Sequence, residues 1–401
     1  MSKLDKLIEE LCPDGVEYKL LGDLEKDSIL ELGRGKVISK KTISDNPGKY
    51  PVYSSSAIGE GLMGKYNQYM FDEVLLSWSI DGGGRFFYRN KHKFSLTNVS
   101  GWLRVLRKDV LNIRYLYYVM DSLWLGKTYD YVNKAHPSVI KNDYLIPLPP
   151  LPVQQEIVRI LDNFTELTAE LTAELTAELT ARKKQYEYYR DESYCFDDSV
   201  QSMSIKDVTV DRFWLMPATP QYLSTGVPYI TSKNVRNGKI SFEDVKYISA
   251  EDYNLISKNR SVKKNDLLIT MIGTIGEAAF VDEFTEFYGQ NLYLVRMDET
   301  RCLRKYFYYY LSSDKIKNAL ISKKNASSQG YIKAGSIDNL QIPLPPIEKQ
   351  KQIVSMLDRF DTLCNDLTSG LPAEIEARRK QYEYYRGKLL SFKNIADRAE
   401  A

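Results

Sequence analysis

The segment Gly59-Glu60-Gly61-Leu62-Met63-Gly64-Lys65 has the glycine spacing of a phosphate-binding loop. It fits GxGxxG and the first part of GxxxxGK, motifs in which backbone N–H groups bind phosphate. A P-loop needs Ser or Thr after the lysine to hold Mg²⁺, and here Tyr66 follows. A dinucleotide-binding loop must open a helix, whereas residues 66–71 have the pattern of a strand or loop. We therefore interpret the segment as a glycine-rich hairpin.

Other candidates for catalysis are few. His92 lies in the basic run 89–93 and His136 precedes Pro137, with no partner at a recognisable spacing, so we predict two solvated loop histidines. The four cysteines lack CxxC spacing, which argues against zinc or a disulfide framework and fits a reducing cytoplasm. The motifs GxSxG and HExxH do not occur, nor does the Asn-Pro-Pro or Asp-Pro-Pro motif of amino-methyltransferases. The sequence predicts a protein without a catalytic site or metal of its own.

Basic loops with Asn, Gln or Thr recur in both halves of the chain and could contact DNA. Lys and Arg neutralise phosphates, while Asn, Gln and Arg can form paired hydrogen bonds with base edges. Such runs can also be solvated surface. The candidate DNA contacts are Lys36, Lys40, Lys41, Arg85, Arg89, Lys91, Lys93, Lys134, Lys233, Asn234, Arg236, Asn237, Thr274, Lys323, Lys324, Asn325, Gln329 and Lys333.

Glycine-rich loops stand at matching places in the two halves. Residues 81–84 (Asp-Gly-Gly-Gly) follow a predicted strand at 73–78, and residues 273–276 (Gly-Thr-Ile-Gly) follow one at 266–271. These loops either let the backbone approach a ligand closely or form tight turns, and the sequence leaves both open.

Length, charge and hydropathy limit the domain organisation and the class of protein. A length of 401 residues predicts two to three domains, and a net charge of +2 requires any nucleic-acid contact to come from local patches. No run of 18 uncharged apolar residues occurs, so we expect a cytoplasmic protein without a membrane span.

Residues 146–190 and 342–386 are two copies of one segment. They align without a gap at an offset of 196, with 26 identities in 45 positions. Strand-rich stretches at 16–145 and 206–341 precede the copies, each ending in a Tyr-rich helix, predicted near 113–125 and 304–321. The chain is therefore two versions of one α/β (α+β) half in tandem.

Each copy opens with Ile-Pro-Leu-Pro-Pro and continues as a long helix. The first contains three Thr-Ala-Glu-Leu units at 168–179, each adding about 6 Å of helix. In the second copy Ser369-Gly370-Leu371-Pro372 should break or kink the helix. Neither apolar stripe can be buried alone, so we expect the two helices to pair as an antiparallel coiled coil about a pseudo-two-fold axis. Alternatively, each packs on its own domain.

Tyrosines are numerous, 30 in all, and occur in clusters. Those at 115–118 and 306–310 fall on the predicted helices, where packing in the core is favoured. The Gln-Tyr-Glu-Tyr-Tyr-Arg ends of both copies could instead form a patch for the partner helix or for another protein. The candidate docking residues are Tyr186, Tyr188, Tyr189, Tyr382, Tyr384 and Tyr385.

Together these features resemble the specificity (S) subunits of type I restriction–modification enzymes. The resemblance is carried by Leu11-Cys12-Pro13-Asp14-Gly15, by the Ile-Pro-Leu-Pro-Pro entries to both helices, and by the Thr-Ala-Glu-Leu units. The two Gln-Tyr-Glu-Tyr-Tyr-Arg ends and the 266–276 strand and loop add to it. The match covers essentially the whole chain, although residues 78–84 depart from the pattern of 270–276.

The resemblance implies a subunit that recognises DNA and leaves chemistry to its partners. Each half would be a target-recognition domain for one part of a split, asymmetric double-stranded DNA site. The paired helices would set the gap and dock two methyltransferase (M) subunits, which use S-adenosylmethionine to methylate adenine. Restriction (R) subunits, which use ATP and Mg²⁺, would join for cleavage.

The domain boundaries that follow are 1–147 and 206–343 for the recognition domains, 148–192 and 344–395 for the spacer helices, and 193–205 for a linker. A non-catalytic coiled-coil scaffold with two protein-binding modules would explain the duplication but not the basic loops. A nucleotide-dependent enzyme would rest on the 59–65 segment alone.

Overall fold

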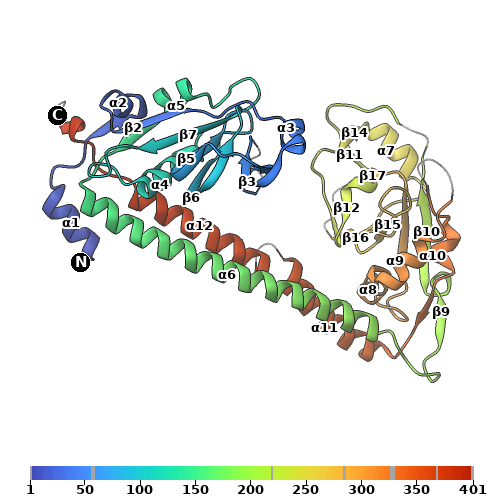
Figure 1. Ribbon diagram of the computed structural model, residues 1–401. Coiled ribbons are helices and arrows are strands. Elements are labelled where there is room, and N and C mark those ends of the chain that lie inside the picture. Colours follow the sequence, from blue (N-terminus) through green and yellow to red (C-terminus); the bar gives the residue numbers. More distant parts are fainter. Residues whose placement is uncertain are drawn as a thin grey trace. The chain divides into compact units, whose positions relative to one another are not determined.

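The computed structural model describes residues 2–55, 59–217, 220–282, 286–325, 330–366 and 369–398. The chain divides into two units (Figure 1). Unit 1 contains residues 1–174 and 375–401, so both ends of the chain belong to it, and unit 2 contains residues 175–374. The long helix α6 (Leu151–Glu192) passes from one unit into the other.

Unit 1 is built on a six-stranded sheet in the order β2-β7-β5-β6-β3-β4. Its neighbouring strands are antiparallel except β3 and β6, which are parallel. Trp78 and Phe86 belong to the main core of the unit, and Leu75 and Phe94 from the same strands form a second, smaller apolar cluster. The strands are β2 (Leu30–Arg34), β3 (Pro47–Tyr53), β4 (Leu62–Tyr66), β5 (Phe71–Ser79), β6 (Phe86–Leu96) and β7 (Ser100–Val105).

The helix α4 (Ile113–Trp124) covers that core. The side chain of Asn112 caps it by accepting hydrogen bonds from the Arg114 and Tyr115 N–H groups. Tyr115 and Tyr118 are buried, which confirms the predicted core role of this cluster. The remaining elements of unit 1 before α6 are α1 (Lys3–Leu11), β1 (Tyr18–Leu20), α2 (Leu21–Lys26), α3 (Lys40–Asp45), α5 (Pro137–Asp143) and β8 (Leu145–Pro147).

Unit 2 has a four-stranded sheet, β10-β18-β15-β16, and a three-stranded sheet, β14-β11-β17. The pairs β12·β13 and β9·β19 complete it. Its strands are β9 (Ser202–Ser204), β10 (Thr209–Leu215), β11 (Val227–Ile230), β12 (Val235–Arg236), β13 (Lys239–Ile240), β14 (Lys246–Ile248), β15 (Leu267–Thr270), β16 (Ala278–Phe280), β17 (Tyr288–Gly289), β18 (Leu292–Met297) and β19 (Gln341–Pro343).

The helix predicted near 304–321 is two helices, which corrects the prediction. α8 (Arg304–Ser312) ends where Ser313 adopts an extended backbone, and the Ser313 side chain caps α9 (Asp314–Ile321) by accepting from the Ile316 N–H. Serine favours such a cap because its hydroxyl satisfies a free N–H of the first turn. The other helices of unit 2 before the second spacer are α7 (Ala250–Ser257) and α10 (Ala334–Asp338).

The duplicated segments form α6, α11 (Ile347–Asn365) and α12 (Leu371–Leu389). The predicted break is confirmed, because α11 ends at Asn365 and α12 begins beside Gly370 and Pro372. A Cβ at Gly370 would lie 2.6 Å from the Thr362 carbonyl oxygen, so only glycine fits this turn.

Within each unit the helices pair antiparallel. In unit 1 the Phe164 ring stacks on Tyr385 and the Thr165 hydroxyl bonds Tyr382. In unit 2 Phe360 stacks on Tyr189. Phe360 corresponds to Phe164 and Tyr189 to Tyr385 at the offset of 196, so the same pair occurs twice with the roles of the two copies exchanged. The part of α6 in unit 1 therefore packs on α12, and its part in unit 2 packs on α11. The alternative, in which each helix packs only on its own domain, is wrong.

Candidate nucleic-acid interface

In unit 1 the loops after β3, β5 and β6 meet. The Ser79 hydroxyl donates to the Ser55 carbonyl oxygen at 2.6 Å, and Thr97 Oγ1 donates to Ser54 Oγ at 3.1 Å. A Cβ at Gly82 would lie 1.9 Å from the Ser55 carbonyl oxygen. The glycine-rich loop 81–84 is therefore required for close contact between two loops of the protein, whatever else it does.

Basic and polar side chains surround this junction. Arg34 Nη2 donates to the Asn98 carbonyl oxygen at 2.7 Å, and Lys36 is bridged to Thr97 through the backbone. Lys134 forms an ion pair with Asp81 at 3.0 Å. We call these loops, 34–36, 54–55, 79–85, 97–98 and 134–136, the unit 1 platform.

Unit 2 brings the corresponding loops together with the same backbone bonds. The Thr97 N–H donates to the Tyr53 carbonyl in unit 1, and the Gln290 N–H donates to Ile230 in unit 2, at 3.0 and 3.1 Å. A second pair of loops also matches. The Ala135 N–H donates to the Ile80 carbonyl oxygen in unit 1, and the Ile332 N–H donates to the Met271 carbonyl oxygen in unit 2, both at 3.1 Å. The unit 2 platform consists of loops 231–234, 271–276, 290–291 and 331–333.

A polar cavity of about 790 Å³ opens at the unit 2 platform. Asn234 is fixed there, since its Oδ1 accepts from the Thr231 N–H at 3.0 Å. Gly273 and Asn291 both have left-handed backbones, with φ of 79° and 64°. A non-glycine residue in this region is uncommon, and such residues concentrate at functional sites. The cavity is lined by Tyr229, Thr231, Ser232, Lys233, Asn234, Ser241, Glu243, Asp244, Val245, Lys246, Ile272, Gly273 and Asn291.

The structure places the candidate DNA contacts in several groups. Lys36 and Lys134 belong to the unit 1 platform, and Lys233, Asn234, Thr274 and Lys333 to that of unit 2. Arg85 also belongs to the unit 1 platform and directly precedes β6, whereas Lys93 lies opposite Asp72 in the β5–β6 register, at the other end of β5. Those elsewhere are Lys40 and Lys41 on α3, Lys91 and Lys93 on β6, Arg236 and Asn237 at the β12–β13 turn, and Lys323, Lys324 and Asn325 after α9. Gln329 lies outside the described residues.

Arg89 differs from the other basic candidates because it is buried. Its side chain donates to Ser77 Oγ at 2.9 Å and to the Glu60 carbonyl oxygen at 2.7 Å, and it lies 3.7 Å above the Tyr53 ring. Burial lowers the pKa of Arg89. This guanidinium stabilises the interior of unit 1, which argues against a direct DNA contact.

Platform residues that sequence reasoning missed include Ser54, Thr97 and Asn98 in unit 1 and Thr231 and Asn291 in unit 2. All but Asn98 directly follow or precede a strand, and none belongs to a basic run. The available signal was positional, because these four residues flank strands that have counterparts in the other half.

The 59–65 segment is a turn followed by the strand β4, so the hairpin interpretation is confirmed. His136 caps α5 through Nδ1 as predicted for a loop residue. His92 is not in a loop but in β6, with its Nε2 3.2 Å from the Tyr53 hydroxyl. The basic run that flanks it suggested a loop, but strand pairing with β5 overrides that local preference.

Buried polar residues of the two copies tie each helix to its own unit. Gln154 Oε1 accepts from the Asn112 N–H at 2.8 Å, and Gln350 Oε1 accepts from Leu303 at 3.0 Å. The Tyr118 hydroxyl donates to Asp162 at 2.6 Å. In unit 2 the Tyr309 hydroxyl donates to Asp358 at 2.5 Å. Asp358 corresponds to Asp162 at the offset of 196, so the two contacts are equivalent.

The arginines that end both copies are both buried, and each lies near an aspartate of its own unit. Arg386 is 6% exposed and donates to Asp121 on α4 at 2.6 Å. Burial raises the pKa of Asp121, and the charge of Arg386 opposes that rise. Arg190 is also 6% exposed and lies 3.8 Å from Asp314 on α9. The end of each copy therefore contacts its own unit through a buried arginine, in addition to presenting exposed side chains.

The candidate docking tyrosines divide accordingly. Tyr186 is 9% exposed, and Tyr382 is half-buried with a bond to Thr165. Tyr189 and Tyr385 stack on Phe360 and Phe164. Tyr188 and Tyr384, by contrast, are 60% and 64% exposed. These two are the tyrosines most available to another protein.

The described residues lack two further features, a membrane span and a metal site. None of the helices in this part of the chain is long and apolar enough to cross a membrane. No cluster of three or more His, Cys, Asp or Glu side chains in the same residues could hold a metal ion.

The fold is that of specificity subunits. A structure titled as the basis of complex assembly and conformational transition of the type I R-M system superposes with a TM-score of 0.63 at 14% identity. The match covers 94% of this chain and 97% of that one. The HsdS subunit from Thermoanaerobacter tengcongensis superposes with a TM-score of 0.51 at 15% identity, covering 95% and 96%.

The sequence identifies the family. The profile described as "Type I restriction modification DNA specificity domain" matches twice, at residues 13–181 and 197–377. The Haemophilus influenzae protein named "Putative type I restriction enzyme specificity subunit S.HindORF215P" is 34% identical, covering 97% of this chain and 98% of its own length. The EcoR124I/EcoR124II specificity subunit of Escherichia coli is 33% identical, covering 70% and 71%. This chain belongs to the type I restriction–modification specificity-subunit family, which is non-catalytic.

Proposed function

We propose that this chain selects the DNA sequence for a type I restriction–modification complex. Each half recognises one part of a bipartite, asymmetric double-stranded site. The observation that carries the proposal is the double match to the specificity family, joined to two platforms with the same backbone bonds and different side chains. Two domains with the same backbone framework and different platform side chains are suited to recognising two different DNA sequences.

The recognition domains are assigned to residues 1–147 and 206–343, the spacer helices to 148–192 and 344–395, and the linker to 193–205. On each recognition domain the platform faces the bases. Exposed lysines such as Lys36 and Lys233 neutralise phosphates, and fixed polar groups such as Asn234 contact base edges. The other exposed candidates extend the phosphate contacts around each platform.

The paired helices set the gap between the two half-sites and dock two methyltransferase subunits, with Tyr188 and Tyr384 at the contacts. The chain itself works without a cofactor. S-adenosylmethionine is used by the methyltransferase partners, and ATP with Mg²⁺ by restriction subunits. The complex acts in the cytoplasm.

The test is methylome sequencing of the host with this gene present and deleted. One bipartite adenine-methylated motif should disappear with the gene. In the same assay Lys233→Ala should lower methylation evenly across sites, whereas Asn234→Ala should relax the choice of base at one position, a loss of about 1–3 kcal/mol of discrimination. An unchanged methylome on deletion contradicts the proposal and favours a scaffold without DNA selection.

A further inference from the structure

The three most exposed large apolar side chains among the described residues lie beside the unit 1 platform. Val132 is 94% exposed and Tyr131 is 81% exposed, and both come just before the platform loop 134–136. Val37 is 80% exposed and directly follows the platform loop 34–36. Apolar side chains that are exposed together mark a contact surface, whereas single ones are ordinary. We call Tyr131 and Val132 the apolar tip.

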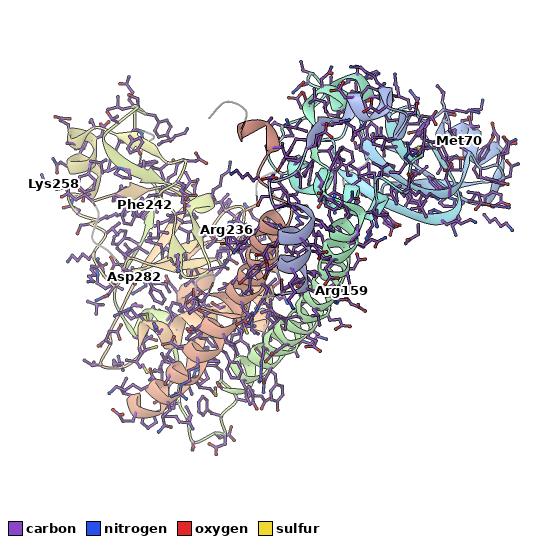
Figure 2. All side chains as sticks on the ribbon, turned by 90° about the vertical axis from the view of Figure 1, so that its left-hand side faces the viewer. Met70, Arg159, Arg236, Phe242, Lys258 and Asp282 are labelled. Atoms are coloured by element: carbon purple, nitrogen blue, oxygen red, sulfur yellow. The ribbon has the colours of Figure 1, made fainter. Side chains whose placement is uncertain are left out.

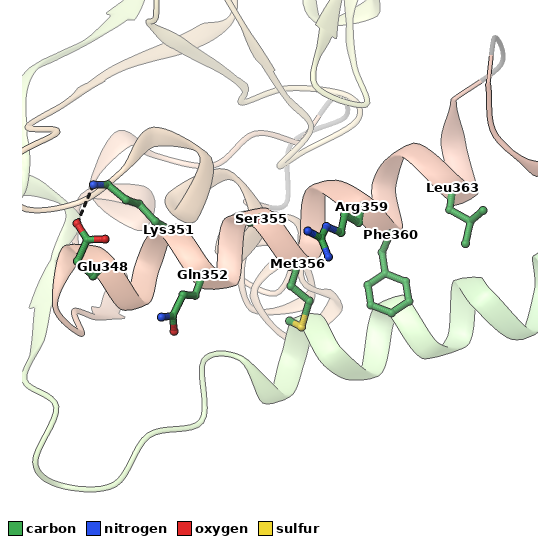
Figure 3. Close-up of a pocket in the computed structure, with 8 residues that line it drawn as sticks. All are labelled: Glu348, Lys351, Gln352, Ser355, Met356, Arg359, Phe360 and Leu363. Carbon is green, nitrogen blue, oxygen red and sulfur yellow. Dashed lines mark hydrogen bonds and ion pairs between the residues drawn. The ribbon is translucent and has the colours of Figure 1, made fainter.

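In the rest of the described chain, large apolar side chains that reach the surface are less exposed. Phe242 (Figure 2) packs edge to face on Phe287 with ring centres 5.4 Å apart. Figure 3 shows Met356 and Phe360 pointing toward α6, and both pack against the core of unit 2. The apolar tip thus differs from these sites, since folding leaves most of its surface in water.

The backbone of the apolar tip is fixed by Asp130. Its Oδ1 accepts from the Val132 N–H at 2.7 Å and from the Asn133 N–H at 2.6 Å. The Asp130 N–H in turn donates to the Asn133 carbonyl oxygen at 3.0 Å, and Asn133 Nδ2 donates to the Thr128 carbonyl oxygen at 3.1 Å. The tip is therefore ordered before any ligand binds, which lowers the entropic cost of binding.

The loop that carries the tip is also joined to the platform. Trp78 Nε1 donates to the Ala135 carbonyl oxygen at 2.8 Å. On the other side of the tip Tyr129 is buried and packs against Gly84, where a Cβ would lie 2.4 Å from the Tyr129 ring. The tip therefore has a fixed place beside the glycine-rich loop 81–84.

The charges around the tip fit a polyanion. Arg34, Lys36 and Lys134 are all exposed. Arg34 Nη1 lies 3.4 Å from His136 Nε2, so the two basic platform loops lie side by side. The nearby carboxylate of Asp81 is paired with Lys134 at 3.0 Å. A basic surface with an apolar tip suits duplex DNA, which is anionic outside and apolar between its stacked bases.

We propose that the apolar tip is a wedge that opens one base step of the DNA, with the Tyr131 ring stacked on a base and Val132 beside it. The inference rests on the proposed function in one respect, that the unit 1 platform binds DNA. Side chains of this kind, inserted between base pairs, unstack and kink a duplex.

The size of the tyrosine ring favours insertion over a contact at the surface of the groove. A duplex offers apolar surface as thymine methyl groups in the major groove and as base faces within the stack. An aromatic side chain buries about 150–250 Å² when it is covered, far more than a methyl group can cover. A base face covers the ring, and it becomes accessible when a step is unstacked. Pyrimidine–purine steps open most easily, so we expect the wedge at such a step.

The wedge belongs to one unit. The matched backbone bonds of Ala135 and Ile332 align the apolar tip with Ser328 and Gln329, which lie outside the described residues. Polar residues at these places do not favour insertion between bases. We therefore expect a single opened step, in or beside the half-site that unit 1 recognises.

Fluorescence of the adenine analogue 2-aminopurine tests the proposal, because stacking quenches it and unstacking restores it. The probes are duplexes of the motif found by methylome sequencing, in which each adenine in turn carries the analogue and the methylated adenines are left unsubstituted. The protein is the full chain in complex with its methyltransferase subunits. One position should brighten on binding, in or beside one half-site only.

Tyr131→Ala should abolish this increase and weaken DNA binding by about fivefold or more, the loss expected for one base–aromatic stack. Tyr131→Phe should retain both, because the ring stacks without its hydroxyl. The salt dependence of binding should keep its slope in Tyr131→Ala, since the phosphate contacts are unchanged. Leu255→Ala is the matched control, because it removes another exposed apolar side chain, on α7 and outside both platforms, and it should change none of these quantities.

Three outcomes overturn the proposal. The first is that no position brightens with the unaltered chain, and the second is that the increase persists in Tyr131→Ala. The third is that Tyr131→Ala binds DNA normally but loses methyltransferase subunits in native mass spectrometry, which would make the tip a protein contact. A motif that depends on this gene and yet shows no opened step leaves the proposed function intact, so the two failures are distinct.

Discussion

Single residues explain why the duplicated segments stayed alike while the platforms diverged. Gln154 is fully buried, and its amide donates to the carbonyl oxygens of Val110 and Pro149. Gln350 repeats this pattern with Arg301 and Pro345. Removing one partner from such a buried set leaves another group unsatisfied, at a cost of about 1–3 kcal/mol. Exposed platform residues such as Lys36 and Lys233 meet no comparable penalty, because their side chains face solvent.

Glu156 gives a pH-dependent prediction at this scale. Hydrogen bonds from Arg159 and then Lys3 lower its pKa from 4.5 to about 2. Because the folded-state pKa is depressed, the stabilisation is complete above the unfolded value near 4.5 and is lost as the pH falls toward 2. Glu156→Gln should raise hydrogen exchange in α1 at pH 7 by about tenfold, on the order of 1.5 kcal/mol.

Hydrogen exchange followed by mass spectrometry, corrected for intrinsic rates, measures this effect. The excess exchange of the variant should shrink as the pH is lowered from 5 to about 2.5. Glu348→Gln is the matched control, since that glutamate is 78% exposed and paired only within its own helix. An equal effect of both variants would show that Glu156 does not hold α1.

At the scale of elements, α6 combines an anchored start with a repetitive middle. Its first turns are buried against unit 1 at Val153 and Ile157, whereas the Thr-Ala-Glu-Leu units are mainly exposed or half-buried. Leucines four residues apart advance about 400° per unit, so the apolar stripe rotates by roughly 40° with each one. The middle of the helix therefore tolerates a change of length better than its ends.

Deleting Thr172-Ala173-Glu174-Leu175 should shorten α6 by about 6 Å. Since the base-pair rise is about 3.4 Å, the gap between half-sites should lose one or two base pairs while both half-sequences persist. Methylome sequencing of a strain with the deletion measures both quantities. A same-length replacement of these residues by Ala-Ala-Gln-Leu should keep the original gap, and a changed half-sequence in the deletion strain would contradict the spacer role.

At the scale of the whole molecule, the C-terminal segment contacts residues near the N-terminus. The Val16 N–H donates to the Lys393 carbonyl oxygen, and the Tyr18 hydroxyl donates to that of Phe392. Unit 1 is thus completed by the C-terminal segment, as unit 2 is completed by the connection through 193–205. Each unit contains one platform, the start of one spacer helix and the end of the other. We therefore expect each unit to recognise its half-site independently.

Exchanging residues 206–341 for the same segment of another family member should therefore change one half-site only. The cut lies before Ile342, which is buried, so the helix side of the anchor, with Gln350 and Asp358, is kept. Methylome sequencing should show the unchanged half-site beside a new one at the original gap. The reciprocal exchange of residues 21–144 should alter the other half-site, and simultaneous change of both halves would show that the domains do not act separately.

The sequence alone determined the duplication, strands such as those at 73–78 and 266–271, the long helix and its break at Gly370, because periodicity, proline and glycine act locally along the chain. The split at Ser313 escaped prediction, since the apolar pattern continues across it. The burial of Arg89 and the gathering of loops such as 54–55, 79–85 and 97–98 were decided only by the tertiary structure. These depend on the pairing of β3 with β6 and β5 with β7, contacts between residues tens of positions apart. The same holds for α1, whose Lys3 bonds Glu156, 153 positions away along the chain.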